Sequence, residues 1–187
     1  MVGCIALLTP GSFHFLNPIE QRAPSRYESW SSFIASCLPS QKIEYRMYRD
    51  AINTADQALV HLAFHCCMKD GELQDEELDL IATSFVAKGV NKELDLKEEM
   101  KTYLSYFRKI TDESTYLIFL IRAIDPTYRM ALFAFCAEIV YRNNRVSFGE
   151  EILLNKLAGL LYVSETESTA VQRLINEMYQ VEKANHF

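Results

Sequence analysis

Apolar residues recur at helical spacing from Tyr48 onward, in runs that are separated by short polar segments. Several of these runs follow a Ser, Thr or Asp that has Gln or Glu three residues later, which is a helix-starting pattern. The patterns predict helices over residues 58–68, from 95 to about 110, over 116–124, from 125 to about 142, and beginning at 147 and at 164. No run alternates apolar and polar residues as a strand does. The predicted fold class is therefore all-α.

Further signals indicate where individual helices begin and end. Asp125-Pro126 places a hydrogen-bond acceptor before a proline, which predicts Asp125 as an N-cap and Pro126 as the first residue of the following helix. Gly89 predicts a left-handed C-cap for a helix that begins near Asp75. Either Thr111 or Asp112 can cap the helix over residues 116–124. With these boundaries the chain contains about seven helices joined by short turns.

The order of the helices contains a weak repeat. A shift of 73 residues places Asp70-Gly71 over Asn143-Asn144 and Glu77 over Glu150. In each half, an apolar helix is followed by a polar turn, one aliphatic residue and a helix with a carboxylate in its first turn. The repeat predicts a compact bundle built from two similar helical hairpins, which bury two faces against one another.

The segment 70–79 holds six carboxylates and no cation. Asp70-Gly71 favours a tight turn, and Glu76 and Glu77 fall in the first turn of the next helix, where the helix dipole favours anions. Aligned with a twelve-residue calcium loop, the segment has suitable residues at positions 5, 6, 8 and 12, but a Cys and a Met at positions 1 and 3. The simpler interpretation is helix capping with solvated carboxylates, and the alternative is half of a cation site.

Residues 54–182 resemble the tellurite-resistance TerB-like family, and the two turns carry the resemblance. That family repeats a turn that consists of a small or apolar residue, Asp-Gly, an aliphatic residue and Glu-Glu. Residues 68–77 match this turn closely, and Asp125-Pro126 is similar to the family's opening of the helix before the second turn. The resemblance implies a bundle of about seven helices and a role in tellurite or stress responses, and related domains occur at the front of some DnaJ-like co-chaperones.

The resemblance also implies a divalent-cation site where the two turns approach each other. The candidate ligands are Asp70, Glu76, Glu77, Asn143 and Glu150, and the ion is Ca²⁺ or Mg²⁺. Asn143 departs from the family's Asp, because it keeps an oxygen ligand but loses the charge. Binding of a cation at this site is therefore expected to be weak.

Composition restricts the partners and the compartment. The formal net charge of −6 argues against nucleic acid, because neutralising phosphates needs clustered Lys and Arg. The five cysteines lack a CxxC pair, which favours a reduced, cytoplasmic setting with buried thiols. No apolar run reaches membrane-spanning length, so we expect no membrane insertion.

The first 46 residues differ in composition from the remainder of the chain. They hold four of the five prolines and the only tryptophan, Trp30. We expect residues 1–46 to be an N-terminal extension that is loosely structured or forms a short helix, and residues 47–187 to be the helical domain. Met47 is an alternative translation start.

His61 and His65 are four residues apart, a spacing that allows two imidazoles to bind one metal ion. They lack an evident third ligand, so a structural or surface role is favoured. Aromatic residues at helical spacing are expected in the core, namely Tyr103, Tyr106, Phe107, Tyr116 and Phe119. Four cations are expected on a solvated helix face, namely Lys97, Lys101, Arg108 and Lys109.

No phosphate loop, nucleophile elbow or dinucleotide-binding motif is present in the sequence. The prediction is a non-catalytic TerB-like domain that binds a protein partner in a stress response, with weak divalent-cation binding. Two alternatives remain open. One is a metal-dependent hydrolase with His61, His65 and Glu138 near one another, and the other is a structural adaptor without a ligand.

Overall fold

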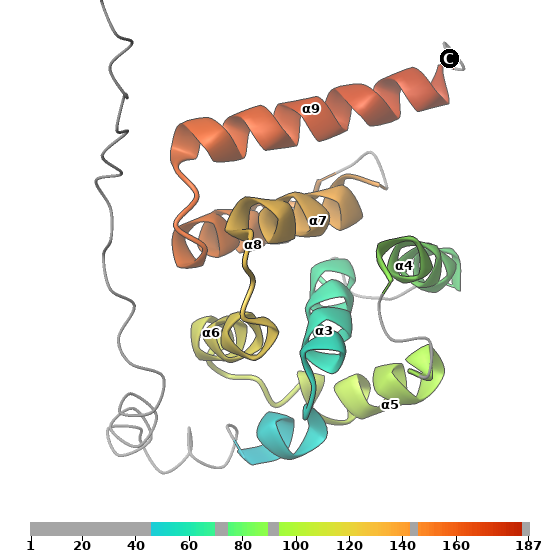
Figure 1. The fold of residues 1–187 in the computed structure, drawn as a ribbon, viewed down its shortest axis with the longest axis vertical. Helices are drawn as coiled ribbons and strands as arrows, with labels where there is room; N and C mark the ends of the chain where they lie inside the picture. The colour runs from blue at the N-terminus through green and yellow to red at the C-terminus, as the bar shows by residue number, and fades with distance from the viewer. Residues whose placement is uncertain (1–45, 70–74, 90–93, 143–145, 185–187) are drawn as a thin grey trace, which may run out of the picture. The chain divides into compact units, whose positions relative to one another are not determined.

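A computed structural model describes residues 46–69, 75–89, 94–142 and 146–184, with the backbone alone for residues 75–77, 80, 87 and 88. All of these belong to one unit, Leu38–Phe187. They form a short helix at 46–51 and the helices labelled in Figure 1, which are α3 (Ala55–Cys67), α4 (Asp75–Lys88), α5 (Leu96–Phe107), α6 (Glu113–Ile124), α7 (Arg129–Tyr141), α8 (Phe148–Leu160) and α9 (Glu165–Lys183). The described residues contain no strand, which confirms the all-α prediction.

Side-chain caps begin most of these helices at the predicted residues. The Thr54 side chain accepts the N–H of Gln57, and Asp95 and Asp112 accept N–H groups in the first turns of α5 and α6. Ser147 and Ser164 each take part in a complete capping box, with a glutamate that accepts the N–H of the cap residue in return. Each cap satisfies N–H groups that have no partner within the helix, and this confirms the predicted starts.

The central helix of the described unit is α3, which packs against α4, α5, α6 and α7. Nine of its 13 residues are buried, and they cover every side of the helix. A helix that is apolar on all sides is stable only when other helices surround it. In Figure 1, α3 accordingly lies among its neighbours, whereas α9 lies along the outside of α7.

The second buried helix is α7, which contacts α3, α8 and α9. Seven of its residues are buried, most of them large apolar side chains. The helices that the repeat relates, α3 and α7, are each 13 residues long, and they pack against each other. The core therefore forms where these two helices meet.

The predicted start of α7 was wrong. Asp125 adopts a left-handed conformation with φ 48°, and its N–H donates to the carbonyl of Ile121 at 2.9 Å, so that it ends α6. The chain then continues through Pro126, and Tyr128 is the N-cap of α7 without a side-chain cap. Asp is one of the few residue types besides Gly that tolerate the left-handed region, which explains why Asp-Pro marks a helix end here.

Other sequence predictions are confirmed within the described residues. Gly89 follows α4 with φ 71°, as a left-handed C-cap requires. The four predicted surface cations are exposed, and the predicted aromatic core residues are buried, apart from the half-buried Phe107. No described helix has the length and apolarity needed to span a bilayer. The predicted N-terminal extension, up to residue 45, lies outside the described residues.

Tyr162 ends α8 in a conformation that favours glycine. Its φ is 57°, its N–H donates to Gly159 at 3.2 Å, and the Val163 N–H donates to Ala158 at 2.9 Å. These two bonds form a Schellman motif, in which the left-handed position is usually Gly. The Tyr162 ring is 80 % exposed and lies under the guanidinium of Arg129 at 4.9 Å. The ring contributes no core packing that would offset the backbone strain.

We expect Tyr162→Gly to be more stable than Tyr162→Ala by about 1 kcal/mol, because both lose the ring but only Gly removes the Cβ from a left-handed residue. Urea unfolding of the two full-length variants gives the difference in the free energy of unfolding. Equal stability of the two variants would contradict the assigned backbone strain.

Candidate functional site

The five predicted metal ligands are only partly within the described residues. Asp70 and Asn143 lie outside them. Glu76 and Glu77 are in the first turn of α4, as predicted, but their side chains are not described. Glu150 is fully described, and it is the position where the prediction can be compared with the structure.

The Glu150 carboxylate is buried and has a structural use. Its Oε2 atom accepts the N–H of Ser147 at 2.6 Å, which completes the capping box of α8. A hydrogen bond with Cys136 and burial raise the pKa of the Cys66 thiol, and the nearby charge of Glu150 raises it further. The capping hydrogen bond gives this buried carboxylate a partner that is independent of any metal ion.

The segments that flank the turns at Asp70-Gly71 and Asn143-Asn144 do lie close together. A Cβ atom placed on Gly149 would be 3.4 Å from the backbone oxygen of Lys69. Lys69 directly precedes the first turn, and Gly149 lies at the start of α8, just after the second. Among the described residues, however, no three His, Cys, Asp or Glu side chains are placed to hold a metal ion. The described residues alone therefore do not form a metal site.

A buried polar network is the most prominent arrangement of ionisable groups in the described structure. It is centred on His61 and His65, which are 0 % and 3 % exposed on α3. Each imidazole binds a tyrosine hydroxyl through Nδ1 and a carboxylate through Nε2. Two parallel units of the form Tyr–His–Glu thus connect α3 to α5 and α6.

The first unit joins α3 to α5. His61 Nδ1 contacts the hydroxyl of Tyr106, and His61 Nε2 lies 3.0 Å from Glu99 Oε2. The Tyr106 oxygen is 2.9 Å from the Tyr116 hydroxyl, and the other oxygen of Glu99 accepts a hydrogen bond from Gln57 at 2.8 Å. The unit is thus a continuous chain of hydrogen bonds from α6 to the start of α3.

The second unit joins α3 to both α5 and α6. His65 Nδ1 lies 2.9 Å from the Tyr103 hydroxyl, and His65 Nε2 lies 3.0 Å from Glu113 Oε1. Glu113 also forms ion pairs with Lys69 and, at 2.6 Å, with Lys156 of α8. A single carboxylate therefore links three helices and the residue that precedes the first acidic turn.

The chemistry of the partners determines the tautomer of both imidazoles. An ionised carboxylate only accepts hydrogen bonds, so Nε2 carries the proton and donates it to Glu99 or Glu113. In a neutral imidazole the Nδ1 atom then accepts, and the tyrosine O–H donates to it. The hydrogen bond from His65 is the main cause that lowers the pKa of Glu113, while burial raises the pKa of Tyr103 and Tyr106. The network is fully hydrogen-bonded with neutral histidines.

Both nitrogens of each histidine are engaged, and burial keeps the two rings from solvent in the described structure. His61, His65 and Glu138 do not form a three-ligand group in the described structure. No buried side-chain nitrogen or oxygen of the described residues lacks a hydrogen-bond partner. The network therefore holds helices together, in agreement with the structural role favoured from the sequence.

Sequence reasoning found the histidines but missed their carboxylate partners. Glu99 and Glu113 are 38 and 48 residues from the histidines that they bind. Glu113 lies in the first turn of α6, where acidic side chains are common, so its position in the sequence does not indicate a buried partner. One signal for these partners was available in the sequence. Two histidines on an otherwise apolar helix are expected to be buried, and buried polar groups require hydrogen-bond partners.

Comparison with known proteins adds no assignment. No family model, curated protein or solved structure matches the chain. The resemblance to the TerB-like family therefore stays a prediction from its turn motifs.

The network makes stability depend on pH near neutrality. Burial lowers the pKa of His61 and His65 below the ordinary value of 6.5, against the opposing effect of their carboxylate partners. Below that value the unfolded chain binds protons that the folded chain does not, so the free energy of unfolding decreases as the pH falls. We expect stability to be fully present above pH 6.5 and to decrease by up to about 1.4 kcal/mol per pH unit for each histidine below it.

Urea unfolding of the full chain between pH 7.5 and 5.5 measures this loss, and His61→Gln with His65→Gln should remove most of it. NMR titration of the imidazole protons in the native wild-type chain provides a second measurement that does not depend on the variants. A native-state pKa at or above 6.5 for both histidines would contradict the prediction.

Proposed function

We propose that the chain is a non-catalytic helical domain that binds another protein. The observation that carries this proposal is the closed histidine network, in which each ring nitrogen of His61 and His65 already has an interior partner. The described cysteines, Cys66, Cys67 and Cys136, are also buried, so they are poorly placed to act as nucleophiles. Because the ionisable groups of the interior are engaged in this way, we place the function on the surface.

The surface supports binding, because it exposes large apolar side chains. These are Val86, Leu104, Tyr128, Phe148, Ile152, Tyr162, Leu174 and Met178. Single exposed apolar residues are common, but residues that share one helix face favour a contact with a partner. The resemblance to the TerB-like family supports a role in a stress response, and the free buried cysteines favour a reduced cytoplasmic setting.

The experiment is reciprocal capture from the cells that make the protein. We expect the tagged full chain to co-purify with a protein in near-equimolar amount, and the tagged partner to recover the chain in return. The mass of the complex, measured by size-exclusion chromatography with light scattering, should exceed the 21.6 kDa of the chain alone. A chain that stays alone after crosslinking would contradict the proposal.

We further propose weak divalent-cation binding between the turn at Asp70-Gly71 and the turn at Asn143-Asn144. The approach of the Lys69 carbonyl to Gly149 supports it, because the segments that flank both turns are in contact. Asp70, Glu76 and Glu77 would supply most of the oxygen ligands, while Asn143 adds an oxygen without a charge. Glu150 already caps α8, so any contribution from it has to come in addition to that hydrogen bond.

Titration of the full chain with Ca²⁺, followed by calorimetry or NMR, tests this second proposal. We expect a dissociation constant of about 10⁻⁴ to 10⁻³ M, the range of sites with few charged ligands. Asp70→Asn with Glu77→Gln should abolish binding, whereas Glu98→Gln with Glu182→Gln, which removes two exposed carboxylates from other helices, should leave it unchanged. Binding that Asp70→Asn with Glu77→Gln leaves unchanged would contradict the site.

A further inference from the structure

Among the described helices, the last one, α9, packs mainly on α7. It has 19 residues, and Ser168 is the buried one among them. Val171, Ile175 and Tyr179 are half-buried, and α9 packs on α7. Two polar contacts also secure it, since Tyr141 donates to Gln172 at 3.1 Å and Tyr179 donates to the Glu138 carbonyl at 3.3 Å. Much of this helix therefore faces away from α7.

The exposed part of α9 carries an apolar seam, by which we mean Val171, Leu174, Met178 and Val181. These residues are spaced at i, i+3, i+7 and i+10, which is the spacing of the a and d positions in a coiled coil. Leu174 is 59 % exposed and Met178 is 51 % exposed, while the two valines are half-buried. The apolar surface of α9 is thus wider than the part that α7 covers.

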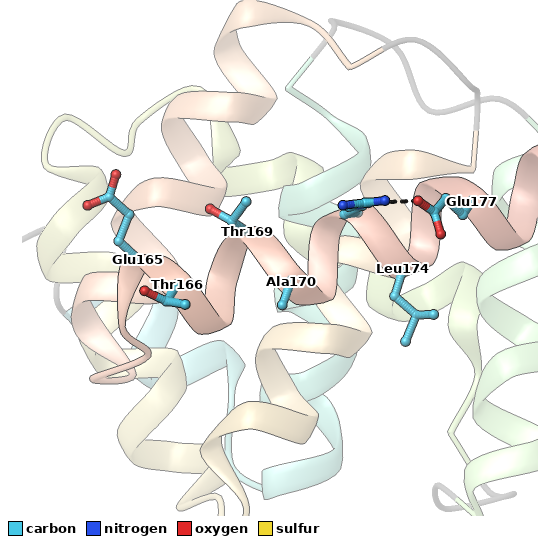
Figure 2. Close-up of a pocket in the computed structure, with 7 residues that line it drawn as sticks. Glu165, Thr166, Thr169, Ala170, Leu174 and Glu177 are labelled. Carbon is cyan, nitrogen blue, oxygen red and sulfur yellow. Dashed lines mark hydrogen bonds and ion pairs between the residues drawn. The ribbon is translucent and has the colours of Figure 1, made fainter.

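A shallow, open depression lies beside Leu174 on the surface of α9. The described residues that line it all belong to α9, and they are Glu165, Thr166, Thr169, Ala170, Arg173, Leu174 and Glu177. Figure 2 shows Ala170 and Leu174 pointing to the same side of the helix, with Glu165 and Glu177 toward its two ends. Small and apolar residues along one line allow a second helix to approach closely.

Glutamates outnumber cations beside the seam. Glu177 and Glu182 occupy the g and e positions that border a and d, and Glu167 lies at the N-terminal end of the seam. All three are exposed. Two cations lie close by: Arg173 forms an ion pair with Glu177 at 2.7 Å, and Arg142, at the end of α7, interacts with Tyr179. Lys183 is nine residues from Leu174, about two and a half turns, and so falls on the opposite side of the helix.

We propose that the seam of α9 binds a basic amphipathic helix of another protein, and this rests on the proposed function as an interaction domain. Apolar residues of the partner would pack against Leu174 and Met178, and its Lys or Arg residues would pair with the bordering glutamates. A second copy of the chain is a poor occupant. Parallel pairing would place Glu177 beside Glu182 of the other copy, and antiparallel pairing would place the two Glu177 residues together.

Two designed peptides of equal length test the seam against the full chain. Both carry Leu at their a and d positions, and the e and g positions are Lys in one and Glu in the other. We expect the Lys peptide to bind at least about tenfold more tightly by fluorescence anisotropy. Leu174→Gln with Met178→Gln, which keeps the net charge, should weaken its binding by about the same factor.

Two further variants separate the seam from general attraction to an acidic protein. Val86→Gln removes an equally exposed apolar side chain from α4, and it should leave peptide binding unchanged. Glu177→Lys with Glu182→Lys should reverse the preference, so that the Glu peptide binds more tightly. Lys-peptide binding that neither seam residues nor bordering charges affect would overturn the proposal.

The remaining outcomes identify other occupants. A dimer of the chain that Leu174→Gln with Met178→Gln dissociates would assign the seam to a second copy and overturn the proposal. If that double variant still captures the cellular partner in equimolar amount, the proposal for α9 fails while the proposed function stands. Loss of the cellular partner in the double variant, with capture retained by Val86→Gln, supports both.

Discussion

The structure depends on the burial of two imidazoles in its central helix. A buried polar group that loses water without gaining a partner costs about 1–3 kcal/mol, so each nitrogen of His61 and His65 requires a hydrogen bond. The two histidines lie one helical turn apart, and their four ring nitrogens need four partners on other helices. Tyr103 and Tyr106 of α5 supply two, and Glu99 and Glu113 supply the others. The positions of α5 and α6 against α3 follow from this requirement.

The network also connects the core to the surface. Its tyrosine end is interior, whereas the carboxylate of Glu113 is 17 % exposed and can reach the lysines at the edge of the bundle. Lys156 of α8 forms an ion pair with this carboxylate, and so does Lys69, the residue directly before Asp70. The position of Lys69, the last described residue before the turn at Asp70-Gly71, is therefore coupled to the hydrogen bond of a buried histidine.

Helix boundaries could be predicted from the sequence where their cause is local. The Ser147–Glu150 and Ser164–Glu167 boxes involve residues three apart, and both form as expected. Asp125 was misplaced because the same residue can cap a following helix or end the preceding one, and the direction of the chain after α6 decides which. The partners of the histidines could not be predicted, because they depend on how α5 and α6 pack on α3.

Central and outer helices of the described unit also differ in where their apolar side chains lie. The central helix α3 is buried on all sides, and its two histidines are hydrogen-bonded to side chains of α5 and α6. The outer helix α9 has the opposite character, because α7 covers one side of it and two large apolar side chains remain exposed on another. Exposed apolar residues at a and d spacing lower solubility unless something covers them. The basic helix proposed above would cover them, and the glutamates beside them would favour its positive charge over a neutral partner.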